Sequence, residues 1–237
     1  MIRRGAAALV TGVVLACAAP LASAQHARLF PPARLGELEG PDRDAWQRPE
    51  QVMDALSIGD GSVVADLGAG GGWFTVRLAR RVGPNGRIYA EDIQPQMIEV
   101  IKRRMQREAL TNVITVQGTA TDPKLSPGSL DAVLIVDAYH ELEEPVALLR
   151  NLATALKPRR TPAVTGDARQ PSAAGDAGGV IGIVEFKKDG GGPGPPMAER
   201  VDPEQVIADA RAAGLELRKR ENFLRYQYLL TFGLPSK

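Results

Sequence analysis

The segment from Val63 to Gly72, which reads Val-Val-Ala-Asp-Leu-Gly-Ala-Gly-Gly-Gly, constrains the fold of this chain more than any other. A short apolar run of this kind predicts a buried strand, and glycines permit positive φ and a close approach of ligand to backbone. A helical pattern follows directly, over residues 74–82. A strand, a glycine turn and a helix in this order are typical of the first unit of an α/β domain that binds a nucleotide-like ligand.

Apolar runs bounded by turn residues alternate with helical patterns along the rest of the chain. We predict strands over residues 62–67, 87–91, 113–117, 132–136, 180–186, 215–220 and 226–232, and helices over 49–56, 74–82, 96–109 and 145–156. A later helix is expected to begin with Asp202 as its N-cap, Pro203 in its first turn and Gln205 as capping-box partner, and to end at Gly214. The pattern predicts an α/β fold with a seven-stranded, mostly parallel sheet, helices on both faces and an antiparallel last strand.

The glycine spacing argues against a nicotinamide dinucleotide as the ligand. The dinucleotide fingerprint G-x-G-x-x-G would place glycines at 68, 70 and 73, and position 73 is Trp. Three consecutive glycines, Gly70 to Gly72, stand where a pyrophosphate binder needs spacing. An oxidoreductase of that type is therefore disfavoured.

The first 24 residues have the features of an export signal. Arg3 and Arg4 precede an apolar stretch over residues 6–19, and Ala22-Ser23-Ala24 forms an A-x-A cleavage site. We predict a signal peptide over residues 1–24 and a periplasmic or exported protein with no integral membrane span in the mature chain. Two alternatives stay open: a lipid anchor at Cys17, or an uncleaved inner-membrane anchor. Cys17 is the sole cysteine, so the mature chain contains no thiol chemistry.

The mature chain divides into a lead-in and one domain. Residues 25–48 are rich in proline and charge and are expected to be irregular, whereas residues 49–237 carry the strand and helix pattern. Residues 158–179 are rich in Ala, Gly, Pro and Asp without periodicity, and we interpret them as a flexible insertion. A second Gly/Pro stretch, 189–196, is the better candidate for a lid because it follows a predicted strand at its carboxyl end.

From about residue 43 to 232, the chain resembles the class I, Rossmann-like S-adenosylmethionine (SAM)-dependent methyltransferases, in an exported bacterial subgroup. The first motif of that family matches residues 66–72, and the acid after its second strand, which holds the ribose hydroxyls, matches Asp92. The loop after the third strand, which recognises adenine, matches residues 117–122, but Thr119 stands where the family often has Asp. The resemblance implies SAM as cofactor, bound by Asp66, Gly68, Ala69, Gly70, Gly72, Asp92, Ile93, Thr119, Ala120 and Asp137.

The end of the predicted fourth strand carries the candidate catalytic residues. In the family this region lines the space beside the transferable methyl group, and here it offers Asp137, Tyr139 and His140. His140 is the natural general base because its ordinary pKa is near neutrality. Asp137 has three open roles: orienting His140, binding substrate or contacting the cofactor. No metal is expected, although a site of Asp137, His140 and Glu141 is not excluded by the sequence.

These observations predict a SAM-dependent methyltransferase whose acceptor is unidentified and is expected to be a small molecule. The formal net charge of +1 gives no nucleic-acid-binding footprint. Two alternatives remain: a SAM-binding sensor or scaffold without catalysis, and a protein methyltransferase. The sequence does not indicate an oligomeric state.

Expression of the full chain in a bacterium with a periplasm is expected to yield a protein that begins at Gln25, because the A-x-A site precedes it. Intact-mass spectrometry of the purified protein measures this. A retained Met1 would instead support the anchor, and a lipid-modified Cys17 would support the lipoprotein.

Overall fold

The computed structural model describes residues 29–159 and 178–236. The predicted signal peptide, its two alternatives and residues 160–177 of the predicted insertion lie outside these residues, so they stay predictions.

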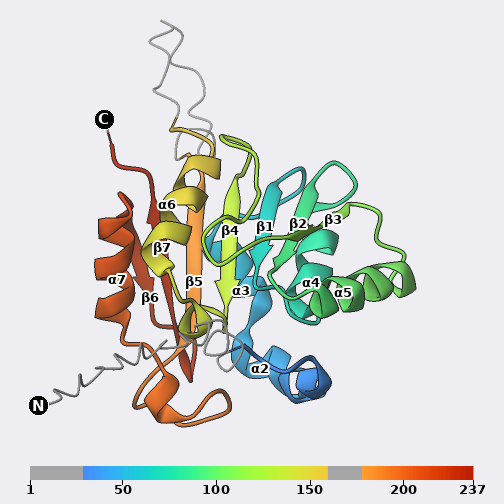
Figure 1. Ribbon diagram of the computed structural model, residues 1–237, viewed down its shortest axis with the longest axis horizontal. Helices are drawn as coiled ribbons and strands as arrows, with labels where there is room; N and C mark the ends of the chain where they lie inside the picture. The colour runs from blue at the N-terminus through green and yellow to red at the C-terminus, as the bar shows by residue number, and fades with distance from the viewer. Residues whose placement is uncertain (1–28, 160–177, 237) are drawn as a thin grey trace, which may run out of the picture.

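Seven strands form one sheet among the described residues (Figure 1). Their order across the sheet is β3-β2-β1-β4-β5-β7-β6. The strands are β1 (Val63–Leu67), β2 (Arg87–Asp92), β3 (Val113–Gln117), β4 (Ala132–Val136), β5 (Val180–Phe186), β6 (Glu216–Glu221) and β7 (Gln227–Gly233). β7 pairs antiparallel with both β5 and β6, and the other pairs are parallel. The predicted mostly parallel sheet with an antiparallel last strand is confirmed.

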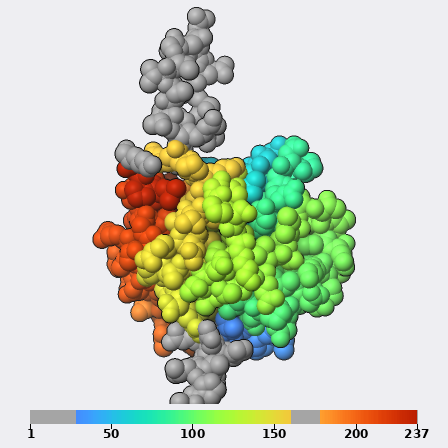
Figure 2. Space-filling model, turned by 45° about the horizontal axis from the view of Figure 1, so that its top comes forward, coloured from blue at the N-terminus to red at the C-terminus, as the bar shows by residue number. Residues whose placement is uncertain are grey.

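Helices cover both faces of the sheet because side chains alternate between the faces along each central strand. Val64 and Leu134 pack under α3 (Pro49–Ala55) and α4 (Trp73–Val82), and α5 (Pro95–Arg107) extends this layer over β2 and β3. Val133 and Ile183 belong to the opposite face, beneath α6 (Pro145–Ala155) and α7 (Pro203–Ala212). Figure 2 shows part of the second layer, with α6 in yellow beside α7 in orange-red.

The described part of the lead-in is more regular than the sequence analysis expects. Residues 29–48 contain a 3-10 helix, η1 (Pro32–Leu38), and a short helix, α2 (Arg43–Gln47). Arg43 and Gln47 are buried, so α2 is held by tertiary contacts that a local pattern does not reveal. Figure 1 shows this blue segment lying across the carboxyl ends of the central strands.

The predicted insertion is attached at the end of the sheet opposite the one that α2 covers. The backbone N–H of Gly179 donates to the carbonyl of Lys157 at 2.8 Å, immediately before β5 begins. The chain therefore departs and returns at the amino-terminal end of β5, away from the strand ends under α2. No helix within residues 29–159 and 178–236 is long and apolar enough to cross a membrane.

α7 begins as predicted, but without the predicted capping box. The Asp202 carboxylate accepts from the backbone N–H of Glu204 at 2.9 Å, which makes Asp202 the N-cap. Gln205 instead donates to Asp209 at 2.8 Å, one turn further along the helix.

Replacing Asp202 with Ala is expected to lower the free energy of unfolding by about 1 kcal/mol, because an orphan N–H at the start of α7 loses its acceptor. Asp202→Asn, which keeps an acceptor oxygen, should stay close to the parent. Urea denaturation followed by circular dichroism measures both; equal losses for the two variants would contradict the capping role.

Candidate active site

A cavity of about 980 Å³ lies at the carboxyl ends of the central strands. The strand order reverses between β1 and β4. Ligands of open α/β sheets bind in the crevice at such a switch point. The volume is at the upper end of the range for small-molecule sites, roughly 300–1,000 Å³. The cavity therefore has room for a nucleoside-sized ligand and a second small molecule.

The glycine turn after β1 forms the floor of this cavity. Gly68, with φ of 66°, packs so closely on the end of β4 that a Cβ would lie 2.7 Å from the Cβ of Ala138. Gly70, with φ of 53°, also lines the cavity. Gly72 does not: it is the N-cap residue of α4 and faces Ile101 and Arg104 of α5. Gly72 is predicted from the sequence as a cofactor contact, but it lies outside the cavity lining because the third glycine of the turn starts the helix.

Three carboxylates line the cavity around the turn. Asp66 accepts from the hydroxyl of Thr75 at 2.6 Å, and burial raises its pKa to about 6. Asp92, at the end of β2, accepts from the backbone N–H groups of Gly70 at 3.0 Å and Gln94 at 2.9 Å. Burial raises the pKa of Asp92, and burial with the charge of Asp92 raises the pKa of Glu91 to about 8.

The loop after β3 reaches the cavity. Thr119 and Ala120 both line the cavity, as does Ile93 after β2. The Thr119 hydroxyl accepts from the backbone N–H of Asp122 at 3.0 Å, so it closes its own loop. Of the two routes to adenine that the sequence leaves open, this geometry favours backbone groups over the threonine hydroxyl.

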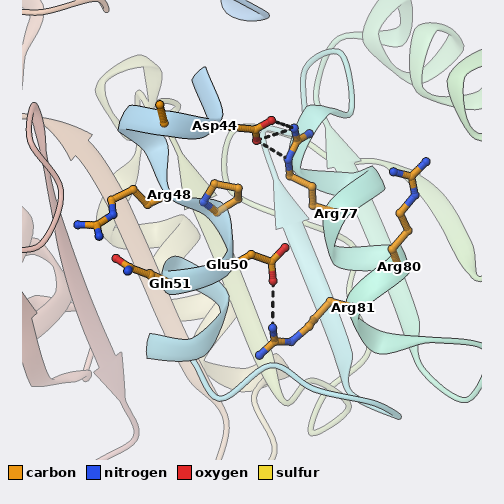
Figure 3. Close-up of a pocket in the computed structure, with 9 residues that line it drawn as sticks. Asp44, Arg48, Glu50, Gln51, Arg77, Arg80 and Arg81 are labelled. Atoms are coloured by element: carbon orange, nitrogen blue, oxygen red, sulfur yellow. Dashed lines mark hydrogen bonds and ion pairs between the residues drawn. The ribbon is translucent and has the colours of Figure 1, made fainter. Parts of the chain in front are cut away.

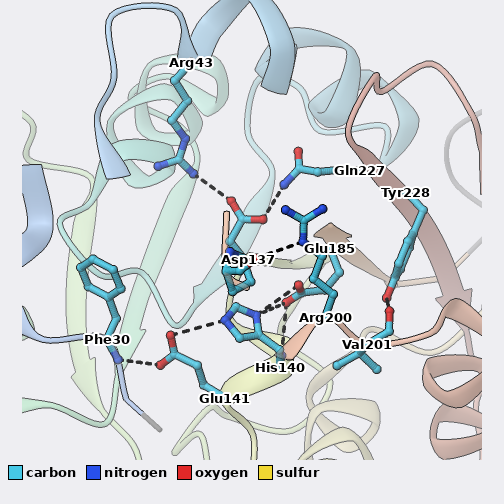
Figure 4. Close-up of polar contacts among 11 residues, drawn as sticks. Phe30, Arg43, Asp137, His140, Glu141, Glu185, Arg200, Val201, Gln227 and Tyr228 are labelled. Atoms are coloured by element: carbon cyan, nitrogen blue, oxygen red, sulfur yellow. Dashed lines mark hydrogen bonds and ion pairs between the residues drawn. The ribbon is translucent and has the colours of Figure 1, made fainter. Parts of the chain in front are cut away.

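The end of β4 carries a buried polar cluster (Figure 4). His140 Nδ1 lies 3.1 and 3.2 Å from the two carboxylate oxygens of Glu185 on β5, and the His140 backbone N–H also donates to Glu185 at 3.2 Å. Glu185 is fully buried and His140 lines the cavity. Burial disfavours the imidazolium, but the hydrogen bond and charge of Glu185, with the charges of Glu141 and Asp137, outweigh it and raise the pKa of His140.

Glu185 is not among the site residues predicted from the sequence, although the sequence carries a signal for it. The residue interrupts the apolar run Val-Ile-Gly-Ile-Val-Glu-Phe of residues 180–186. A charged side chain in a strand buried on both faces needs a partner, and the partner here is His140.

Asp137 is the hub of a closed ring of hydrogen bonds. Gln227 on β7 donates to one Asp137 oxygen, and Arg43 Nη2 lies 3.5 Å from the other. Gln47 Nε2 donates to Gln227 at 2.8 Å, and Arg43 Nε donates to Gln47 at 2.8 Å, which completes the ring. Burial, opposed by Arg43, raises the pKa of Asp137 to about 7. Arg43 and Gln47 thus bring the lead-in into the site.

Tyr139 lies away from the cavity. Its hydroxyl donates to Asp209 of α7 at 2.8 Å, and its ring is buried in the core beneath α6. Contrary to the prediction from the sequence, Tyr139 therefore does not share the cavity with Asp137 and His140. Successive residues of η2 (Tyr139–Glu141) point in different directions, and of these three only His140 and Glu141 line the cavity.

Residues 29–42, which we call the N-terminal strap, form one wall of the cavity. The Phe30 backbone N–H donates to Glu141 at 3.0 Å, and its carbonyl accepts from Gln94 at 3.1 Å. Glu39 pairs with Arg104 beside the glycine turn. The strap therefore touches both the side of the cavity that carries the glycine turn and the side that carries Glu141.

The Gly/Pro stretch that follows β5 also reaches the cavity. Pro193, Gly194, Pro195 and Pro196 line it, as the lid interpretation of residues 189–196 requires.

A second depression, of about 780 Å³, lies between α3 and α4 and is rich in arginine (Figure 3). Its arginines are engaged: Arg77 pairs with Asp44 at 2.7 Å, Arg81 with Glu50 at 3.0 Å, and Arg80 with Glu108 at 2.6 Å. It is a surface ion-pair network and offers no cluster of free cations for an anion. Within the two described ranges, no group of three His, Cys, Asp or Glu residues is arranged to hold a metal ion.

Comparison with known proteins assigns the fold. Residues 64–159 match a family model described as a methyltransferase domain. A solved SAM-dependent methyltransferase from Aquifex aeolicus superposes with a TM-score of 0.75 and 24% identity, covering 86% of this chain and 98% of that one. This chain has the class I methyltransferase fold.

Curated relatives match over part of their length. A demethylmenaquinone methyltransferase from Lactococcus lactis is 29% identical over 115 residues, which are 48% of this chain and 45% of the relative. A ubiquinone biosynthesis O-methyltransferase from Xanthomonas campestris is 26% identical over 140 residues, 56% of this chain and 57% of the relative. The chain thus spans about half the length of the curated relatives it matches.

The solved neighbour from Aquifex aeolicus is described as SAM-dependent, and the residues of the cavity fit SAM. Asp92 presents a carboxylate at the end of β2, where it can accept from two ribose hydroxyls. Gly68 and Gly70 bring bare backbone to the floor, and Asp66 and Asp92 supply negative charge that suits a cationic ligand.

Asp92→Ala is expected to weaken SAM binding by roughly 10- to 100-fold, because the ribose loses a charged hydrogen-bond acceptor. Isothermal titration calorimetry measures the dissociation constant. Glu216→Ala, which changes an exposed carboxylate on β6 outside the cavity, is the matched control and should bind SAM like the parent. Equal affinity of Asp92→Ala and the parent would reject the ribose assignment.

Proposed function

We propose that this protein is a SAM-dependent methyltransferase that acts on a small molecule carrying an acidic O–H or N–H group. The observation that carries the proposal is His140, held by the fully buried Glu185 at the wall of a cavity that fits SAM. The relatives named above give a second line of support, since one is named a demethylmenaquinone methyltransferase and the other a ubiquinone biosynthesis O-methyltransferase.

SAM supplies an electrophilic methyl group on a sulfonium, so the protein has to align the acceptor and remove its proton. His140 is suited to the second task. When Nδ1–H of the neutral ring donates a hydrogen bond to Glu185, Nε2 is left as a hydrogen-bond acceptor. Nε2 points toward Glu141, 3.8 Å away (Figure 4). The acceptor's proton then moves to Nε2, and Glu185 stabilises the imidazolium that forms.

The acceptor side of the cavity is largely apolar. Trp46 and Phe186 lie with ring centroids 5.7 Å apart, and Leu142 and Leu148 line the same cavity. Residues 193–196 add three prolines to the wall. This lining favours a hydrophobic small molecule over a peptide side chain as acceptor.

Export is a separate proposal, supported by the sequence of residues 1–24 alone. If the protein is exported, its cofactor has to reach it from the cytosol, where SAM is made.

The function is tested by incubating the purified protein with methyl-labelled SAM and a panel of hydroxylated aromatic compounds. Transfer of label to a panel member supports the enzyme. SAM binding without transfer to any small molecule or protein would instead favour the non-catalytic sensor or scaffold.

With the best acceptor, His140→Gln is expected to lower kcat by about 100-fold or more, because the acceptor keeps its proton, while SAM affinity is retained. Tyr139→Phe is the matched control, since Tyr139 lies next in the chain but faces α7. Steady-state kinetics and calorimetry separate the two effects; unchanged kcat in His140→Gln would reject the base.

Activity should rise with pH as His140 loses its proton, because only the neutral ring accepts the acceptor's proton. Glu185 raises the pKa of His140, so Glu185→Gln should lower kcat and also move this rising limb to lower pH. A pH–rate profile shows both changes. A lower kcat with an unmoved limb would mean that Glu185 affects folding rather than His140.

A further inference from the structure

The charged side chains that line the cavity offer no obvious partner for the carboxylate of the cofactor's amino-acid part. This inference rests on the proposed use of SAM, whose amino-acid part carries one carboxylate and one ammonium group. Carboxylates that suit cations are plentiful, with Asp66, Asp92 and Asp137 all lining the cavity. A carboxylate ligand requires a cation or several N–H donors instead.

Two arginines are among the described residues that line the cavity, and they differ in burial. The side chain of Arg34 is 59% exposed and pairs with Glu37 of the same helical turn. The side chain of Arg43 is 9% exposed. Arg43 is therefore the cation that is both sequestered from water and placed within the cavity wall.

Arg43 lies beside the glycine turn, where the amino-acid part of the cofactor is expected. Its guanidinium stacks over the ring of Trp73, 4.2 Å from the centroid, and Trp73 is the first residue of α4 after the turn. Its other neighbour, Asp137, precedes Ala138, the residue on which Gly68 packs. A ligand on the turn is thus bordered by Arg43 and Asp137.

The guanidinium is held in place but its donors are not all used. Nε donates to Gln47 at 2.8 Å and Nη1 to the carbonyl of Leu38 at 2.6 Å, which fix its position. Nη2 has a 3.5 Å contact with Asp137, which is long for a charged hydrogen bond. A guanidinium has five N–H donors, so Arg43 has N–H donors that the described residues do not engage and that are available to a ligand.

We infer that Arg43 and Asp137 together recognise the zwitterion of the cofactor: Arg43 binds its carboxylate and Asp137 its ammonium group. Without the ligand the two side chains pair loosely with each other. With the ligand bound, Arg43 contacts its carboxylate and Asp137 contacts its ammonium group. The long contact between the two side chains is then replaced by two short contacts to the ligand. Because Arg43 is on α2, the lead-in becomes part of the cofactor site.

The test compares two ligands that differ in this zwitterion. S-adenosylhomocysteine carries the amino-acid part, and methylthioadenosine lacks it; both contain adenosine and an uncharged sulfur. Calorimetry of the full chain with each ligand gives a ratio of dissociation constants. Arg43→Gln should weaken S-adenosylhomocysteine by roughly 10- to 100-fold and leave methylthioadenosine within about twofold, because only the former has the carboxylate.

Three further variants separate recognition from folding. Arg107→Gln removes the same charge from the exposed last turn of α5, outside the cavity, and should change neither affinity. Arg43→Lys keeps the charge but loses the planar fork, so it should recover part of the affinity for S-adenosylhomocysteine. Gln47→Leu keeps the guanidinium but removes one bond that positions it, so it should weaken S-adenosylhomocysteine less than Arg43→Gln does and leave methylthioadenosine close to the parent.

The outcomes distinguish this inference from the proposed function. If the parent chain binds neither ligand, the assignment of SAM itself fails. If the parent binds both and Arg43→Gln weakens both equally, Arg43 is only a structural latch and the inference is wrong. It is also wrong if Arg43→Gln changes neither affinity.

Discussion

A carboxylate buried at the end of β4 has to be paired, and much of the site is arranged around that requirement. Asp137 has φ of 54°, a left-handed conformation that Asp tolerates better than most residues. Leaving such a buried charge without its partner costs on the order of 3–5 kcal/mol. Arg43 and Gln227 meet this need from opposite ends of the chain, and in doing so they fix α2 across the strand ends.

The same ring joins the stability of the fold to the shape of the site. α2 is five residues long, too short to persist alone, so its place depends on the buried contacts of Arg43 and Gln47. The N-terminal strap, which precedes α2, lies directly over the glycine turn: a Cβ at Gly71 would meet Glu39 at 2.9 Å and Leu35 at 3.5 Å. The strap therefore borders this part of the cavity, and its contacts to Gln94, Arg104 and Glu141 are polar.

The sequence predicted the sheet well because its central strands are apolar runs and the intervening helices have clear boundaries. The placement of the glycine turn, Asp92 and His140 at strand ends could also be predicted, because each lies in a motif that directly follows or ends a strand. Long-range partnerships were not. Gln47 meets Gln227 across 180 residues and Asp137 meets Gln227 across 90, and no local pattern encodes such pairs. Glu185 was visible as a charge within an apolar strand, but its partner depended on the register of β4 and β5. Tyr139 shows the converse, since adjacency to His140 did not place it in the cavity.

The place where the predicted insertion leaves the fold has a practical consequence. Lys157 and Gly179 are hydrogen-bonded neighbours at the end of the sheet opposite the cavity, so the two chain ends there are already brought together by the fold. The entropic cost of closing a connection grows only slowly with its length. This end of the sheet is consequently a natural attachment point for a fused reporter domain or a surface tether. Attachment there would hold the protein with its cavity facing outward.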